Sequence, residues 1–241
     1  GIDKTNDHII EIAVKVLCFE TSSGKILSVE GSYESFNDPE EDISTEITLL
    51  TGIENKMVDG KFIDWNEVDA LFQDVDIIIA HNASFDRAFI DRFSSNSPSK
   101  IWACSISDID WLERGFTSSK QELLCYWHGF YFDAHRAMND VDALIHLLTF
   151  DTGLERPLLE LIKNSNKPEF VIYAEHFKYD PVKKDILKGN KYRWNPNDKI
   201  WFKKVNLDEL EHEKDWLAAT IYDQVFKGRV EEIIPSNKYK L

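Results

Sequence analysis

The fold is decided by residues 75–86, which read Val-Asp-Ile-Ile-Ile-Ala-His-Asn-Ala-Ser-Phe-Asp. The first six residues are mostly apolar and β-branched, and they predict a buried strand. The chain after Asn82 predicts a helix, because aromatic residues recur there at every fourth position: Phe85, Phe89 and Phe93. Sites in α/β folds form where strands end, so Asp86, in the first helical turn, is a candidate site residue.

A second polar segment, residues 135–140, reads His-Arg-Ala-Met-Asn-Asp and precedes an apolar stripe that predicts a helix over residues 140–150. Five helical residues turn through roughly 500°, so His135 and Asp140 would lie about 140° apart on one helix. We therefore expect His135 on the preceding loop, bent back over Asp140. Taken singly, each acid is better explained by a favourable interaction with a helix N-terminus, and the histidine by simple exposure.

The rest of the first 150 residues predicts an α/β layered domain, because strands come first and then alternate with helices. We expect strands over residues 9–17, 26–33 and 101–104, and helices over residues 65–72, 107–114 and 120–128. Ser44 is a candidate N-cap for a further short helix through Leu50, and Gly52 is its expected stop.

The chain has 241 residues, 43% of them hydrophobic, which is ample for a packed core. Its net charge of −15 is unusual for a nucleic-acid-binding protein, which normally has a basic surface. Residues 165–205, however, contain ten Lys and Arg against five Asp and Glu. An acidic remainder is compatible with holding divalent cations, since Mg²⁺ prefers oxygen ligands.

Three cysteines without close pairing (Cys18, Cys104 and Cys125) predict reduced thiols in a cytoplasmic protein and argue against a disulfide framework or a zinc site. No apolar stretch is long enough to span a membrane, and the N-terminus lacks the basic start of a signal peptide.

We expect three parts in the chain: a domain over residues 1–155, a polar linker over 156–168, and a small basic and aromatic α/β domain over 169–241. In the last part, a predicted hairpin interleaves candidate nucleic-acid-binding residues: Arg193, Trp194, Trp201, Lys203 and Lys204. Aromatic stacking combined with phosphate contacts is how single strands are held. A hairpin with aromatics packed inward and solvated lysines explains the pattern equally well.

Residues 1–150 resemble the DEDDh branch of the 3′–5′ exonuclease superfamily, which includes proofreading subunits of bacterial replicative polymerases. The resemblance rests on residues 1–13, on His81 to Asp86 and on His135 to Asp140, in that order and spacing. It implies an RNase H-like fold with a mixed five-stranded sheet, and a role in DNA replication or repair or in RNA trimming.

The resemblance also implies a mechanism. Four carboxylates would bind two divalent cations, Mg²⁺ or Mn²⁺, with Asp86 and Asp140 as the third and fourth acids. His135 would be the general base, and Asn82 and Phe85 would lie near the terminal nucleotide. Two cations about 3.5–4 Å apart can stabilise both the attacking and the leaving oxygen, and histidine titrates near neutral pH.

One family motif is absent from the 241 residues. The first strand of the family carries Asp-x-Glu just before a turn whose glycine matches Gly1. We therefore expect this form to lack the first, central strand, to be inactive or weak, and to leave a gap between the strands near residues 9–17 and 75–80. Alternatively, a segment from elsewhere in the chain or from another copy would fill the gap, or the two strands would pair directly with each other.

Two functions are compatible with the residues. The first is a metal-dependent 3′–5′ exonuclease that acts on single-stranded DNA or RNA ends. The alternative is a non-catalytic nucleic-acid-binding or scaffold protein that retains the fold. Self-association and a polymerase or repair partner are both left open.

Overall fold

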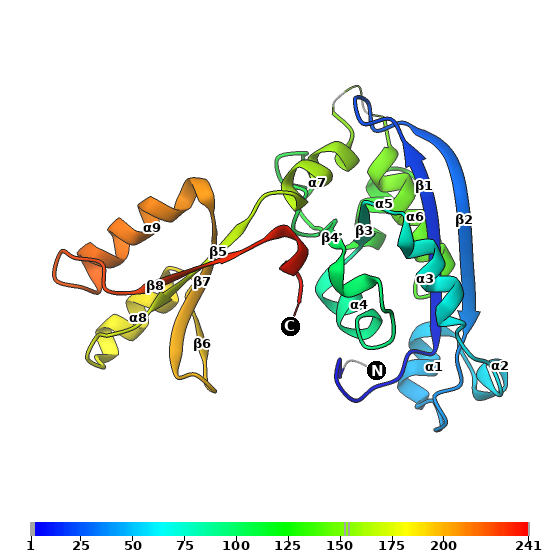
Figure 1. The fold of residues 1–241 in the computed structure, drawn as a ribbon, viewed down its shortest axis with the longest axis horizontal. Helices are drawn as coiled ribbons and strands as arrows, with labels where there is room; N and C mark the ends of the chain where they lie inside the picture. The colour runs from blue at the N-terminus through cyan, green and yellow to red at the C-terminus, as the bar shows by residue number, and fades with distance from the viewer. Residues whose placement is uncertain (1–2, 152, 154, 241) are drawn as a thin grey trace. The chain divides into compact units, whose positions relative to one another are not determined.

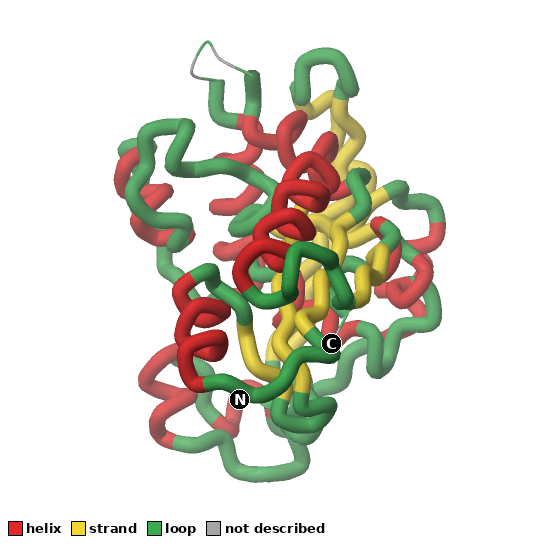
Figure 2. The backbone as a smooth tube through the Cα atoms, turned by 90° about the vertical axis from the view of Figure 1, so that its left-hand side faces the viewer, coloured by secondary structure: helices red, strands yellow, loops and turns green. Residues whose placement is uncertain are grey.

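The computed structural model describes residues 3–151, 153 and 155–240, which form two compact units (Figure 1). The first unit extends to Asn166 and includes Tyr239, and the second is Lys167–Lys238. Strands and helices lie side by side along the backbone (Figure 2). The α/β architecture that the sequence predicts is therefore present in both units.

The strands of the first unit form two separate ladders in the described residues. β1 (Glu11–Phe19) pairs antiparallel with β2 (Ile26–Phe36), and β3 (Ile77–Ala80) pairs in parallel with β4 (Ile101–Cys104). No ladder joins β1 to β3. The gap that the sequence predicts between these two strands is thus present.

Helices cover both faces of the divided sheet. On one face, α5 (Gln121–Trp127), α6 (Ala137–Thr149) and α7 (Pro157–Ser165) form a core with Ile77 and Ile79. On the other face, α3 (Trp65–Gln73) and α4 (Ala83–Ile90) pack with Ile78 and Ala80. Alternate residues of β3 point to opposite faces, so its wholly apolar sequence matches its place between two layers of helices.

Two short helices lie between β2 and α3, namely α1 (Thr45–Thr51) and α2 (Asn55–Val58). The side chain of Ser44 accepts a hydrogen bond at the start of α1, and Gly52 ends the helix in the left-handed conformation, as the sequence predicts. Residues 107–114 form turns instead of the predicted helix, because the Asp108 carboxylate accepts the Cys104 N–H at 2.8 Å.

The sequence predicts a linker over residues 156–168, but most of these residues form a helix of the first unit, so this prediction is wrong. Pro157 opens α7, whose Leu158 and Leu161 are buried in the core of the first unit. Proline is favoured at the first helical position, and leucines three apart share a helix face. The domain boundary therefore lies near Asn166, later than the predicted residue 155.

The second unit is a four-stranded antiparallel sheet with two helices. Its strands are β5 (Glu169–Ala174), β6 (Arg193–Asn195), β7 (Ile200–Asn206) and β8 (Arg229–Ile233), in the order β6-β7-β5-β8. The helices α8 (Pro181–Gly189) and α9 (Leu207–Thr220) contribute Leu187, Leu210 and Leu217 to the core. From the sequence we expect one long helix over residues 207–226, but α9 ends six residues earlier, at Thr220, and β8 is not among the expected elements.

Candidate active site

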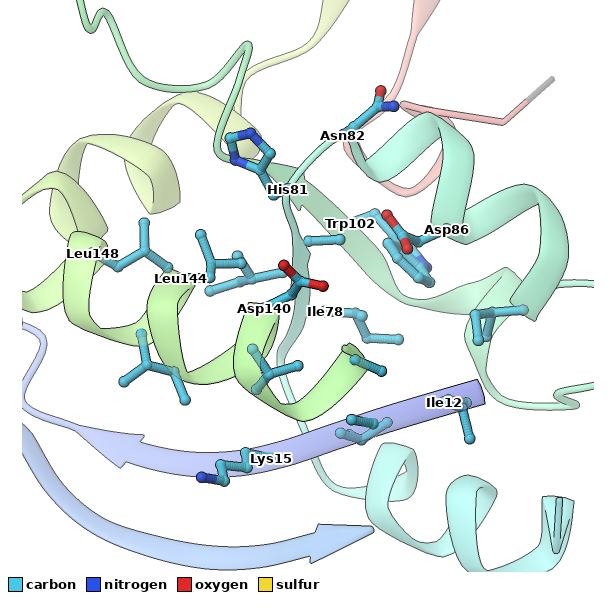
Figure 3. Close-up of a pocket in the computed structure, with 18 of the residues that line it drawn as sticks. Ile12, Lys15, Ile78, His81, Asn82, Asp86, Trp102, Asp140, Leu144 and Leu148 are labelled. Atoms are coloured by element: carbon cyan, nitrogen blue, oxygen red, sulfur yellow. The ribbon is translucent and has the colours of Figure 1, made fainter. Parts of the chain in front are cut away.

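A cavity of about 1930 Å³ lies between the two ladders of the first unit (Figure 3). Consecutive residues line it along both strands, from His8 to Phe19 and from Asp74 to Asn82. Side chains alternate across a strand, so an unbroken run of lining residues shows that backbone edges border the cavity. The three isoleucines of β3 are only half-buried as a result. The cavity is a slot between two unpaired strand edges.

Asp86 reaches this cavity from the first turn of α4. The chain enters α4 through Asn82, which adopts the left-handed conformation with φ of 72°. Asparagine tolerates that conformation better than most residues, which explains its place between strand and helix. Its side chain forms no hydrogen bond that caps the helix.

Asp140 reaches the same cavity from the first turn of α6 (Figure 3). That helix begins at Ala137, three residues earlier than predicted, so neither Asp140 nor Asn139 is at its start. Burial, together with the nearby charge of Asp140, raises the pKa of Asp86 to about 7. The pKa of Asp140 is also raised, chiefly by burial. The two carboxylates thus face one shared cavity, as their spacing predicts.

His135 lies on the loop before α6, as the angular argument predicts. Its φ of 66° is left-handed and turns the backbone so that its N–H points to Oδ1 of Asp140, at 3.4 Å. The imidazole is about half exposed, and its Nε2 lies 3.7 Å from Oε1 of Glu122. His135 also lines the cavity, so all three predicted residues meet there.

Asn82 and Phe85 likewise line the cavity. Asn82 is exposed, and Phe85 is half-buried against Phe89 with ring centroids 5.0 Å apart. An exposed amide and an apolar ring beside two carboxylates suit contacts with a nucleotide base or sugar.

Residues that the motifs do not reveal also shape the site. Glu11 binds Arg136 and the N–H of Ala137, and its charge raises the pKa of Asp140. The side chain of Gln121 donates to the backbone oxygen of Asp140 at 2.6 Å. His81 is 2.7 Å from Oγ of Ser105, and burial lowers its pKa to about 4, so it is uncharged at neutral pH.

The donor set supplies part of a divalent-cation site. Two nearby carboxylates with raised pKa values are suited to a cation, because a positive charge between them removes their repulsion. In residues 3–151, 153 and 155–240, however, no cluster of three or more His, Cys, Asp or Glu side chains could hold a metal ion. Further carboxylates would have to enter the slot to complete the site.

The predicted hairpin residues divide between the two faces of the second unit's sheet. Trp194 and Trp201 are cross-strand partners with ring centroids 5.4 Å apart, and Trp201 packs on the core. Lys203 Nζ lies 2.6 Å from the buried carboxylate of Glu213. Arg193 and Lys204 are exposed. Lys203 and Trp201 therefore have structural contacts that the sequence did not indicate.

None of the helices in the described residues has the length and hydropathy needed to cross a bilayer.

Comparisons with known proteins place this geometry in a family. A model of the exonuclease (RNase_T) family matches residues 1–148. A PolC-type DNA polymerase III of Halalkalibacterium halodurans is 27% identical over 208 residues, covering 82% of this chain and 13% of the polymerase. A PolC-type DNA polymerase III of Caldanaerobacter subterraneus is 39% identical over 95 residues, covering 37% of this chain and 6% of the polymerase. The chain thus spans a small part of these relatives' length.

Among solved structures, exonuclease I matches 98% of this chain and 61% of its own with a TM-score of 0.52 at 17% identity, which supports the fold. Since the family model covers more than half of the sequence, the chain belongs to the exonuclease family, in its DEDDh 3′–5′ branch with an RNase H-like fold.

Proposed function

We propose that this protein is a metal-dependent 3′–5′ exonuclease that trims single-stranded ends. The observation that carries the proposal is the meeting of Asp86, Asp140 and His135 at one cavity, from α4, α6 and the loop before it. A scaffold would have no need of all three. Because the curated relatives are DNA polymerases, DNA is the favoured substrate, with RNA as the alternative.

Asp86 and Asp140 would hold the divalent cations, Mg²⁺ or Mn²⁺, which supply charge stabilisation at the phosphate when bound. His135 would take the proton of the attacking water, since its imidazole is half exposed beside Asp140. Asn82 and Phe85 would position the terminal nucleotide. Glu122, near Nε2 of His135, would orient the imidazole.

We further propose that the complete site includes an extended strand, carrying Asp-x-Glu, between β1 and β3. The unpaired edges on both sides of the slot support this arrangement, and so does the part-built donor set. The slot is also larger than the roughly 300–1,000 Å³ of ordinary ligand pockets, as a polypeptide occupant requires. The 241-residue form by itself should be weak or inactive.

The test compares the 241-residue chain with a version extended before Gly1 by a strand that contains Asp-x-Glu. With Mg²⁺ or Mn²⁺, the extended version should shorten a 5′-labelled single-stranded oligonucleotide from its 3′ end, and Asp140→Ala should abolish the product ladder. Asp142→Ala is the matched control, because Asp142 lies on the same helix but pairs with Lys15.

Absence of trimming by the extended version, or equal trimming after Asp140→Ala, would contradict the proposal. Retained binding of oligonucleotide without trimming would instead favour a non-catalytic nucleic-acid-binding protein.

A further inference from the structure

Four side chains form one line across the sheet of the second unit. Arg193 on β6 is directly opposite Phe202 on β7, and Phe202 is opposite Tyr173 on β5. Tyr173 is in turn opposite Arg229 on β8. Residues directly opposite in a ladder share a face of the sheet. We call this line the Arg-Phe-Tyr-Arg row.

The row lies on the face opposite the helices. Ile172 and Ala174, the neighbours of Tyr173 along β5, are buried with residues of α8 and α9. Since side chains alternate along a strand, Tyr173 and its three partners point to the other side. That face also carries Lys204, Glu169 and Glu231 among its outward positions, and Glu175, two residues after Tyr173, lies 3.8 Å from Arg229. Lys204 and Arg229 are therefore paired with carboxylates on this face.

The two aromatic rings are held differently. The guanidinium of Arg229 lies 3.9 Å from the ring centroid of Tyr173, and the Tyr173 hydroxyl donates to Glu231 at 3.1 Å. Arg229 also binds Glu231 at 3.1 Å, which fixes the Tyr173 ring in place. In the described part of the chain, Phe202 packs against no other aromatic ring and Arg193 makes no ion pair. The ring of Phe202 and the guanidinium of Arg193 are therefore available to contact a ligand.

We propose that the Arg-Phe-Tyr-Arg row binds single-stranded nucleic acid, with a base stacked on Phe202 and a phosphate bound by Arg193. An aromatic ring next to a basic side chain suits a base and its adjoining phosphate in a single strand. Arg229 is occupied by Glu231 and Tyr173, so it acts as a positioning residue. This inference rests on the proposed exonuclease function, because the row would hold the strand that is trimmed.

The experiment measures binding without catalysis, by fluorescence anisotropy of a labelled oligothymidylate in EDTA, using the full 241-residue chain. A length of about 16 nucleotides covers the usual site sizes of single-strand-binding folds. Phe202→Leu should weaken binding roughly 5- to 150-fold, the effect of losing one stacked base. Phe202→Trp should restore it. An oligouridylate of equal length distinguishes DNA from RNA.

Arg193→Gln tests the phosphate contact separately. It should reduce the slope of log affinity against log salt by about 0.7, the value for one phosphate contact on a single strand. The matched controls are Tyr179→Leu and Lys188→Gln, since both residues are exposed in the same unit but lie outside the sheet. Neither control should change affinity or the salt slope.

Equal binding by Phe202→Leu and Tyr179→Leu would overturn the row as a binding site. If Phe202→Leu fails to fold, an unchanged salt slope for Arg193→Gln would overturn it instead. Trimming by the extended protein can succeed in either case, so the exonuclease proposal is judged independently. Weakened binding by Phe202→Leu in a protein that never trims would support the row and refute the nuclease.

Discussion

Glu11 ties the start of β1 to the first turn of α6 through Arg136. The Glu11 carboxylate accepts hydrogen bonds from the Arg136 guanidinium at 2.9 and 3.1 Å. It also accepts the Ala137 N–H at 2.9 Å, so it acts as an anion at the helix N-terminus. One side chain therefore fixes the helix that carries Asp140 against the strand that borders the slot.

Glu11→Ala should lower the free energy of unfolding by about 1–2 kcal/mol. The N-terminus of α6 loses a nearby negative charge, and the Ala137 N–H loses its hydrogen-bond acceptor. Urea denaturation followed by circular dichroism measures this change. Glu41→Ala, which removes an exposed loop carboxylate, is the control and should have no measurable effect. Equal stability of Glu11→Ala and Glu41→Ala would show that the contact contributes little.

Asp86→Asn should stabilise the metal-free protein in a pH-dependent way. The pKa of Asp86 rises from 3.8 to about 7 on folding, so the folded chain keeps a proton that the unfolded chain releases between these values. Wild-type stability should therefore fall as pH rises from about 4 to 7, by up to about 4 kcal/mol, and stay reduced above 7. Asn cannot ionise, so the variant should lack this fall.

Melting temperatures measured from pH 4 to 8 in EDTA give the comparison for Asp86→Asn. Asp59→Asn, at an exposed position, should follow the wild-type profile. A gain in stability that is largest at pH 4, and not at pH 8, would contradict the assigned burial of Asp86.

An added strand should protect the edges of β1 and β3 from hydrogen exchange. Both edges are unpaired in the described residues, and each newly made backbone hydrogen bond contributes roughly 0.5–1.5 kcal/mol. Exchange at β1 and β3 should slow in the extended version and the melting temperature should rise, by about 2–4 °C for each kcal/mol gained. An extension with prolines at alternate positions is the control, since proline donates no hydrogen bond.

Lys203→Glu should destabilise the second unit by about 3–5 kcal/mol, because it leaves the buried Glu213 carboxylate without its partner and adds a like charge. Lys204→Glu, at the next position on the exposed face, should cost much less. Thermal unfolding of the two variants checks the difference. Loss of oligonucleotide binding in Lys203→Glu alone would reflect unfolding, whereas loss in Lys204→Glu would indicate a contact.

The sequence predicts the elements around the site better than those that connect the domains. β4 is predicted to the residue, and α1 has both of its predicted ends, because caps and β-branched runs act locally. α7 was mistaken for a linker because polar residues follow its buried leucines. β8 was missed because its sequence, Arg-Val-Glu-Glu-Ile, has the charged residues typical of an edge strand.

The sequence predicts the positions of those candidate site residues whose spacing within the motifs fixes their geometry. Asp86, Asp140 and His135 meet as expected, but the role of Glu11 depends on a contact 126 residues away in sequence. On the hairpin, the pattern of basic and aromatic residues did not reveal which of them share a face. Lys203 and Trp201 face the helices, whereas Phe202, not among the predicted residues, faces outward.

The slot between β1 and β3 has a practical consequence. A fold divided along a strand can be assembled from two molecules, because the backbone edges recognise an incoming peptide in the same way whether or not it is covalently attached. The 241-residue chain would then be the large fragment of a split enzyme and a short synthetic peptide the small one. Trimming would be switched on by peptide concentration, giving a nuclease whose activity is titrated by fragment complementation.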